Sequence, residues 1–404
     1  MPTLAASDDL IRSRESEMIG LLRDWASINS GSDHEAGLAR MLEALCEGFS
    51  VLPGELEIVP CTGGTNGAGG PEGFPRKALR IRREGADGGR PVLLNGHYDT
   101  VYGEAHPFQE VEALDGRRLR GPGVADMKGG LVVLLYALKL WEEGPHGGSL
   151  SWEVLLTPDE ETGSAASIPL LRESAARCGL GLVYESADVA GRFVRRRMGS
   201  AVYTLDAWGR AAHVGRNFEE GRNALLALAG LCREVADIGA EEKLIVNLGA
   251  LSGGGPLNVV PGFARSRWNV RSFEEKDFAT FEAAVRRLLE RVGGRLPAGI
   301  AFEFSGGPSR PPKPDDESAR GLRAALESVA AGLLPPVEWR DTGGGSDGSN
   351  LAVYGLPNLD NLGVRGGGLH SEAEFVELDS LVERVRLSLA ILDAVRRREF
   401  FPYV

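Results

Sequence analysis

Two histidines and several carboxylates of this chain have the spacing of metal ligands. His97 and Asp99 follow the apolar run 92–94, and Asn95-Gly96 marks the end of that predicted strand. Residues two apart on an extended segment point the same way, so this imidazole and this carboxylate can share one face. The pair suits a metal-binding histidine whose other ring nitrogen is oriented by a carboxylate, although another group could also be that partner.

Other candidate ligands follow other predicted buried elements. Asp126 lies where a Gly/Pro-rich loop meets the apolar helix 131–140, and Glu185 ends the apolar strand 180–184. With Glu161 and His370, which also lie at the ends of predicted buried elements, the candidate metal ligands are His97, Asp126, Glu161, Glu185 and His370. Imidazoles and carboxylates are ligands that Zn²⁺ accepts when no thiolates are offered. This set exceeds the needs of one tetrahedral zinc and suits two ions, ~3.5–4 Å apart, that share Asp126 as a bridge.

The adjacent carboxylates Glu160 and Glu161 could divide two tasks between them. They lie in the segment PDEETGS, directly after the predicted strand 150–157. One of them can bind metal while the other takes a proton from water in the site, because a general base must lie within hydrogen-bond reach of its proton. The alternative interpretation is a solvated acidic turn.

The order of predicted elements indicates how these residues are positioned. Up to residue 197, strands alternate with helices, which is typical of an α/β fold with a mixed sheet flanked by helices. From 198 to 308 the order becomes β-α-β-β-α-β, which predicts an inserted ferredoxin-like α+β domain. Helix and strand alternation resumes over 309–404. We therefore expect a catalytic domain in two parts, 1–197 and 309–404, interrupted by a smaller domain.

Composition and charge exclude several classes of protein. The net charge of −12 argues against a general nucleic-acid binder, which needs clustered Lys and Arg for phosphate contacts. No apolar run approaches the ~20 residues that cross a bilayer. The N-terminal segment lacks the layout of a signal peptide. The four cysteines show no paired spacing, so we expect reduced thiols in a cytoplasmic protein without membrane contact.

A second glycine-rich segment, TGGGSDGSN, could bind an anion. Its consecutive residues Gly343, Gly344 and Gly345 let the backbone approach a ligand and aim amide groups at a carboxylate. A plain flexible turn is the alternative. His213, close to Gly215 in GRAAHVG, is by itself typical of a surface histidine.

Five motifs resemble, in order, those of a family of dinuclear-zinc amidohydrolases. They are GHYDTV, GPGVADMKGG, PDEETGS, VYES and GGGLHSEAEF. The family comprises glutamate carboxypeptidases, aminoacylases, acetylornithine deacetylases and succinyl-diaminopimelate desuccinylases. The likeness covers nearly the whole chain. It is strongest to the bacterial glutamate carboxypeptidases that cleave folate-type glutamate amides, at GHYDTVY, GRAAHVG and TGGGSDGSNLA.

The resemblance implies a role for each candidate ligand. His97 and Glu185 would bind one zinc ion, Glu161 and His370 the other, and Asp126 would bridge both. Two Zn²⁺ ions are the implied cofactors, with Co²⁺ or Mn²⁺ as substitutes. The fold implied is the zinc-peptidase-like mixed sheet, with the inserted domain as a lid and dimerisation domain.

The resemblance also implies roles for residues outside the ligand set. Asp99 would orient His97, and Glu160 would be the general base. His213 would donate to the oxyanion across a homodimer interface. Arg271 and Asn258 would contact the substrate, with Arg271 suited to a carboxylate.

The expected activity is hydrolysis of an amide bond in a small peptide or N-acyl amino acid. A carboxypeptidase of the glutamate carboxypeptidase type is the leading hypothesis, and an N-acyl amino acid deacetylase or a dipeptidase is the alternative. A hypothesis of another class is a non-catalytic, metal-bound ligand-binding protein. The intact Glu160 argues against that hypothesis, because a scaffold needs no base beside a ligand.

Overall fold

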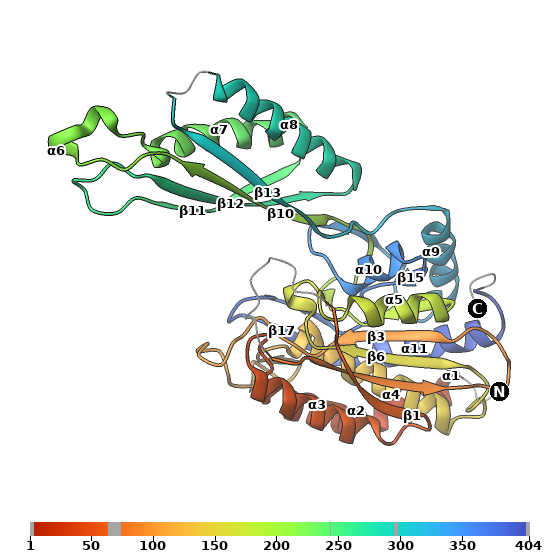
Figure 1. Cartoon of the computed structure of the whole chain (residues 1–404). Helices are drawn as coiled ribbons and strands as arrows, with labels where there is room; N and C mark the ends of the chain where they lie inside the picture. Colours follow the sequence, from red (N-terminus) through yellow and green to blue (C-terminus); the bar gives the residue numbers. More distant parts are fainter. Residues whose placement is uncertain (1–3, 64–73, 243, 295–297, 401–404) are drawn as a thin grey trace. The chain divides into compact units, whose positions relative to one another are not determined.

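The chain forms two compact units, each with its own hydrophobic core (Figure 1). A computed structural model describes residues 4–63, 74–242, 244–294 and 298–400. Unit 1 consists of Met1–Arg196, Pro314–Thr342 and Ser346–Val404, and unit 2 of Arg197–Lys313 and Gly343–Gly345. Unit 2 thus extends five residues beyond the predicted boundary at 308. The function of this insertion as a lid and dimerisation domain stays a prediction.

A six-stranded mixed sheet forms the centre of unit 1. Its strands, in spatial order, are β1 (Glu55–Pro60), β2 (Lys77–Arg83), β6 (Trp152–Thr157), β3 (Val92–His97), β7 (Leu180–Val183) and β15 (Asn358–Leu359). Pairing is antiparallel from β1 to β6 and parallel from β6 to β15. Every residue of β3 and β6 is buried, as expected for parallel strands covered on both faces. The predicted α/β mixed sheet is confirmed.

Helices cover both faces of this sheet, and alternate strand residues face different helices. Leu94 belongs to the larger core, whose helices are α1 (Leu4–Ser13), α2 (Glu15–Ala26), α3 (Glu35–Phe49), α4 (Gly129–Glu143), α9 (Glu317–Ala330) and α11 (Asp379–Arg396). Leu93 belongs to a smaller core with α5 (Ile168–Arg177) and α10 (Asp347–Val353). Apolar residues all around α4 match its burial within the larger core. No helix in the described ranges is long and apolar enough to span a membrane.

Short strands of unit 1 frame the loops that carry chemistry. A five-stranded sheet has the order β4 (Glu112–Ala113), β5 (Arg118–Arg120), β17 (Phe375–Glu377), β16 (Arg365–Gly367) and β8 (Ala187–Asp188). A separate pair joins β14 (Trp339–Thr342) and β9 (Phe193–Arg197). The loop between β16 and β17 contains His370, so antiparallel pairing of these strands fixes both ends of that loop.

Unit 2 is an antiparallel sheet with helices on one face, as predicted. Its elements, in chain order, are β10 (Gly199–Trp208), α6 (Val214–Asn217), η3 (Phe218–Glu220), α7 (Ala224–Glu241), β11 (Ile245–Gly253), β12 (Phe263–Ser272), α8 (Lys276–Gly293) and β13 (Ala301–Arg310). The spatial order β11-β12-β10-β13 gives the ferredoxin-like arrangement of the four strands. The long helices α7 and α8 pack against this sheet (Figure 1).

The last strand of unit 2 is longer than the sequence indicates. A strand is expected over 300–304 with a proline-rich linker from 308, whereas β13 continues to Arg310 and includes Pro308. Proline removes a ladder hydrogen bond and is tolerated on an edge strand. β13 is an edge strand, and its register with β10 shifts between Ser200 and Ala201, opposite Pro308.

Candidate metal centre

His97 lies at the end of β3 with three carboxylates around one of its ring nitrogens. Its Nε2 atom is 3.4 Å from Asp126 Oδ1, 3.8 Å from Glu185 Oε1 and 3.9 Å from Glu160 Oε2. The side chain is 1% exposed. An imidazole nitrogen within 4 Å of three buried carboxylates is the arrangement of a cation site.

A second imidazole faces the other oxygen of Asp126. His370 Nε2 is 3.4 Å from Asp126 Oδ2 and 3.2 Å from Glu161 Oε2. The two Asp126 oxygens therefore point to different histidines, and the five predicted ligands form two groups that share this carboxylate. A bridging carboxylate between two metal ions requires this geometry.

The sheet explains why residues so distant in sequence converge. His97 ends β3, the turn η2 (Glu160–Thr162) follows β6, and Glu185 follows β7. These three strands are parallel neighbours, so their carboxyl ends meet at one edge of the sheet. Asp126 lies in the turn η1 (Val124–Lys128), which leads into α4. Functional sites of open α/β sheets form at this edge.

The carboxylates and imidazoles of the centre shift one another's pKa. Burial and the neighbouring Asp126 carboxylate raise the pKa of Glu161 to about 8. Although burial opposes it, the contacts with Asp126 and Asp99 raise the pKa of His97 well above its usual value. Contacts with Asp126 and Glu161 raise the pKa of His370 to about 11. Protons on the imidazoles thus offset the carboxylates in the metal-free protein, and metal binding would release them.

The donor atoms fit a pair of metal ions. His97 Nε2 and Asp126 Oδ1 are buried and have no hydrogen-bond partner among the described residues. Buried polar atoms are normally satisfied, so two such atoms 3.4 Å apart are suited to a shared metal ion. Two alternative combinations of side chains, which share His97, have donor atoms close enough to hold an ion: His97, Glu160 and Glu185, or His97, Asp126 and Glu161.

Asp99 contacts His97, as predicted, and also contacts three groups outside His97. His97 Nδ1 is 3.3 Å from Asp99 Oδ1 and 3.1 Å from the backbone oxygen of Asp99. The carboxylate also accepts hydrogen bonds from the backbone N–H groups of Glu160 and Glu161 and from the Ser32 hydroxyl. Asp99 thus connects the end of β3 to the turn that carries Glu160 and Glu161. Sequence spacing indicates only the contact with His97.

The two adjacent glutamates have different neighbours. Glu161 contacts His370, whereas Glu160 lies on the side of His97 and Glu185. Glu160 is 7% exposed, and its backbone is held by Asp99. The geometry is compatible with Glu160 as a metal ligand or as a base, and substitution of Glu160 distinguishes the two roles.

The predicted substrate residues belong to unit 2 and form two separate groups. His213 and Asn258 are exposed and adjacent, since the N–H of Val214 donates to the Asn258 carbonyl oxygen. The His213 ring accepts from the N–H of Gly215, at the start of α6. In the other group, the Arg271 guanidinium donates to the Gly343 carbonyl oxygen and to the Asn269 side chain.

These two groups lie at opposite ends of the unit 2 sheet. Arg271 pairs with Ser200 near the start of β10, and Phe263 pairs with Trp208 at its end. The eight steps from Phe263 to Arg271 along β12 span ~26 Å at ~3.3 Å per residue. His213 lies beyond the far end, where α6 is drawn in Figure 1. One small ligand cannot contact both Arg271 and His213 of the same chain.

The glycine loop is surrounded by arginines that sequence reasoning missed. The Arg197 guanidinium donates to the carbonyl oxygens of Gly344 and Gly345, and a Cβ on Gly345 would lie 2.4 Å from the Arg310 side chain. Burial and the nearby Arg310 lower the pKa of Arg271. The loop carbonyls thus accept hydrogen bonds from Arg197 and Arg271, and Arg310 lies beside the same loop. Arg310 lies within the segment GGPSRPP. The prolines of this segment predicted a linker, whereas β13 continues through it to Arg310.

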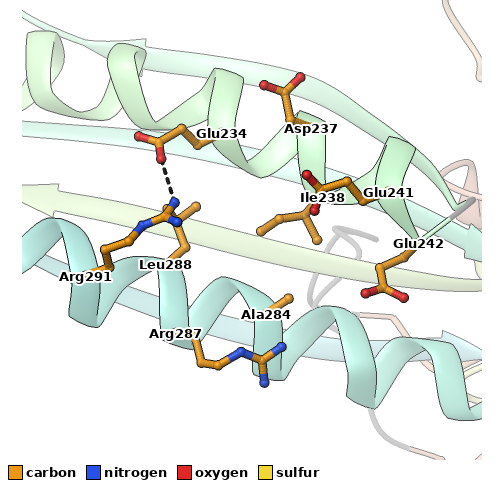
Figure 2. Close-up of a pocket in the computed structure, with 9 residues that line it drawn as sticks. All are labelled: Glu234, Asp237, Ile238, Glu241, Glu242, Ala284, Arg287, Leu288 and Arg291. Carbon is orange, nitrogen blue, oxygen red and sulfur yellow. Dashed lines mark hydrogen bonds and ion pairs between the residues drawn. The ribbon is translucent and has the colours of Figure 1, made fainter.

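Unit 2 also has a groove between its two long helices. Its volume is about 510 Å³ (Figure 2), and it is lined by Glu234, Asp237, Ile238, Glu241, Glu242, Ala284, Arg287, Leu288 and Arg291. The acidic residues come from α7 and from Glu242 directly after it, and the arginines come from α8; Glu234 and Arg291 form an ion pair of 2.9 Å. None of the predicted site residues lines this groove.

Comparison with known proteins connects this centre with a family. The sequence pattern of peptidase family M20/M25/M40 matches residues 93–394, a range that includes every candidate ligand. Carboxypeptidase G2 of Pseudomonas sp. (strain RS-16) is 31% identical over 312 residues, which are 76% of this chain and 74% of that protein. The succinyl-diaminopimelate desuccinylase of Gluconobacter oxydans (strain 621H) is 28% identical over 396 residues, which are 93% of this chain and 96% of that one.

The fold is also that of solved structures. A tripeptidase from Staphylococcus aureus superposes with a TM-score of 0.76 at 22% identity, covering 95% of this chain and 99% of that one. The predicted fold class and the family resemblance are thus confirmed. The chain belongs to peptidase family M20/M25/M40 and is a metallopeptidase or amidohydrolase with candidate ligands for a dinuclear metal site.

Proposed function

We propose that this chain is a zinc-dependent carboxypeptidase of the glutamate carboxypeptidase type, which cleaves the amide bond of a small peptide or N-acyl amino acid. The main supporting observation is that Asp126 faces His97 with one carboxylate oxygen and His370 with the other, and that Glu160 lies beside His97. Nitrogen and oxygen ligands without thiolates suit Zn²⁺, with Co²⁺ or Mn²⁺ as substitutes. The likeness to carboxypeptidase G2 supports the carboxypeptidase assignment.

The residues of the centre have defined tasks in this proposal. Bound ions would polarise the scissile carbonyl group and lower the pKa of water toward ~7. Glu160 takes a proton from the attacking water and returns it to the leaving nitrogen. Asp99 keeps Glu160 in place through the backbone N–H of that residue, at 3.0 Å. The low exposure of Glu160 and Glu185 limits access of bulk water to the reacting groups.

The arginines beside the glycine loop of unit 2 support a substrate with a free carboxylate. Arg271 lies beside Arg310, and its guanidinium already contacts the Gly343 carbonyl oxygen. A guanidinium can bind a carboxylate through two parallel hydrogen bonds, and partial burial strengthens such a contact. In this proposal, unit 2 is the lid that supplies the carboxylate-binding residues Arg271 and Gly343–Gly345.

Replacing Arg271 by alanine tests the carboxylate preference. Arg271→Ala is expected to lower kcat/KM about 30-fold for N-acyl glutamates, because a charge-assisted contact of ~2 kcal/mol is lost. Substrates whose α-carboxylate is blocked as an amide should be cleaved slowly by wild type and variant alike. Arg267→Ala is the matched control, since Arg267 lies on the same strand and is exposed. An equal loss with free and blocked substrates would contradict carboxylate recognition by Arg271.

N-acyl amino acid deacylation is the second candidate function. The likeness to a succinyl-diaminopimelate desuccinylase extends over 93% of this chain, more than the 76% matched by carboxypeptidase G2. A panel of N-acetyl and N-succinyl amino acids, N-acyl glutamates and dipeptides separates the candidates. The carboxypeptidase proposal requires that turnover depend on the C-terminal residue more than on the acyl group. The reverse ranking would favour the deacylase, and cleavage of unacylated dipeptides alone a dipeptidase.

A homodimer formed through unit 2 would reconcile the positions of its substrate residues. His213 and Asn258 lie far from Arg271 within one chain, so a shared substrate must receive His213 from a second copy. β11 is an edge strand, and its exposed residues include Ile245, Leu248 and Leu251. An edge with unpaired backbone groups and exposed apolar side chains is suited to pairing with a second copy.

Complementation between inactive variants tests this dimer. Co-expression of Glu160→Gln and His213→Ala chains should restore roughly a quarter of wild-type turnover per chain, because half the dimers then have one intact site. Co-expression of Glu160→Gln with Glu161→Gln is the control, since both changes affect the centre of one chain. Light scattering should show a dimer. A monomer with full activity, or no complementation with His213→Ala, would contradict the action of His213 in trans.

A further inference from the structure

Glu374 is a buried carboxylate whose oxygens face the turn that carries Asp126. It follows His370 by four residues and is 1% exposed. Its Oε1 accepts hydrogen bonds from the backbone N–H groups of Ala125 and Asp126, both at 3.0 Å. Its Oε2 accepts from the N–H of Gly123 at 3.1 Å and lies 2.8 Å from the Tyr102 hydroxyl. These four donors use the four acceptor positions of an ionised carboxylate.

We propose that Glu374 is a positioning residue that holds Asp126 in register with His370, so that the second metal ion of the proposed centre can bind. This inference rests on the proposed metal centre. The Glu374 carboxylate connects the backbone of Asp126 to the loop that carries His370. The single Tyr102 O–H can donate either to Glu374 or to the backbone oxygen of Ser371, 2.9 Å away in that loop. Three segments, which carry His97, Asp126 and His370, thus meet at one carboxylate.

The contacts predict which of the two ions depends on Glu374. Two of the ligands proposed for the second ion, Asp126 and His370, are on segments that Glu374 joins. The first ion receives Asp126 and His97 from those segments, but His97 is the last residue of the buried strand β3, which fixes its position independently, and Glu185 follows the buried strand β7. Displacement of one segment relative to the other should therefore weaken the second ion more than the first.

A change of Glu374 to glutamine removes the acceptors without removing the side chain. A glutamine amide offers one acceptor oxygen and places an NH₂ group against backbone N–H donors. At most two of the four donors can then be satisfied. Changes in groups that orient metal ligands typically weaken metal binding ~10–100-fold. We expect a loss of this size for the second ion.

The experiment titrates Zn²⁺ into metal-free, full-length wild type, Glu374→Gln and Glu372→Gln, with calorimetry and metal analysis after dialysis. Glu372 is the matched control, because it is an exposed glutamate of the same loop, two residues after His370. We expect two ions per chain in wild type and the control. In Glu374→Gln the first ion should bind normally and the second ~10–100-fold more weakly. Thermal unfolding of the metal-free proteins reports any loss of stability separately.

Different outcomes would contradict the positioning role of Glu374 and the proposed metal centre on which it rests. Unchanged affinity for both ions in Glu374→Gln, with or without a lower Tm, would overturn the positioning role. If Glu374→Gln does not fold, Tyr102→Phe replaces it, since it removes one of the four donors and should weaken the second ion in the same direction. Unchanged binding in that variant would equally overturn the role. Fewer than two ions in wild type would instead overturn the proposed metal centre.

Discussion

Replacing Glu160 by glutamine is expected to lower kcat by at least ~10²-fold while both metal ions stay bound. Glutamine has nearly the same shape but cannot take a proton from water. The backbone N–H of residue 160 would still donate to Asp99, so the turn that carries Glu161 should keep its position. Steady-state kinetics on an N-acyl glutamate, together with metal analysis of the same sample, measures both quantities.

The neighbouring Glu161→Gln variant makes the assignment of the two glutamates testable. Glu161 contacts His370, so its loss should weaken the second ion, whereas Glu160→Gln should leave that ion in place. The reverse pattern, with metal lost from Glu160→Gln, would show that Glu160 is a ligand. If Glu160→Gln kept full metal content and wild-type turnover, Glu160 would not be the general base.

Replacing Asp126 by asparagine is expected to have the largest effect on metal content. The amide lacks the negative charge and one of the acceptor oxygens by which Asp126 faces both His97 and His370. Both ions should therefore bind more weakly. Activity should fall at least ~10³-fold, because the stabilisation that metal ions give the transition state is worth several kcal/mol. Turnover and bound metal are measured at equal free Zn²⁺.

Asp115→Asn is the control for this change. Asp115 is exposed, pairs with Arg118 and has no contact with the centre. Its substitution should leave both metal content and kcat unchanged. If Asp126→Asn kept two ions with wild-type affinity, a bridging role for this carboxylate would be wrong, even if activity were lost for another reason.

Local sequence patterns were sufficient for the fold because its elements carry strong local signals. The apolar runs of β3 and β6 indicate buried strands, and the apolar run of α4 indicates a buried helix. The β-α-β-β-α-β order of unit 2 is likewise visible in the periodicity. The end of β13 was not predictable, because only the position of this strand at the sheet edge makes Pro308 acceptable there.

The candidate site could be predicted only in part, since convergence in space is a long-range property. Candidate ligands at the ends of buried elements were visible, and the structure brings these five together. Their division into two groups around Asp126 depends on side-chain directions that no local pattern shows. Glu374 could not be singled out because SEAEF contains a second glutamate, Glu372, and only burial distinguishes Glu374 from it. The separation of His213 from Arg271 depends on strand pairing within unit 2.

The central claim is that side chains from positions 97 to 370 hold two metal ions that share Asp126. Crystals of the zinc-loaded protein, measured on both sides of the zinc absorption edge, test it most directly. We predict two anomalous peaks ~3.5–4 Å apart, one beside His97 and Glu185, the other beside Glu161 and His370, with Asp126 between them. A single peak, or peaks away from these side chains, would contradict the account.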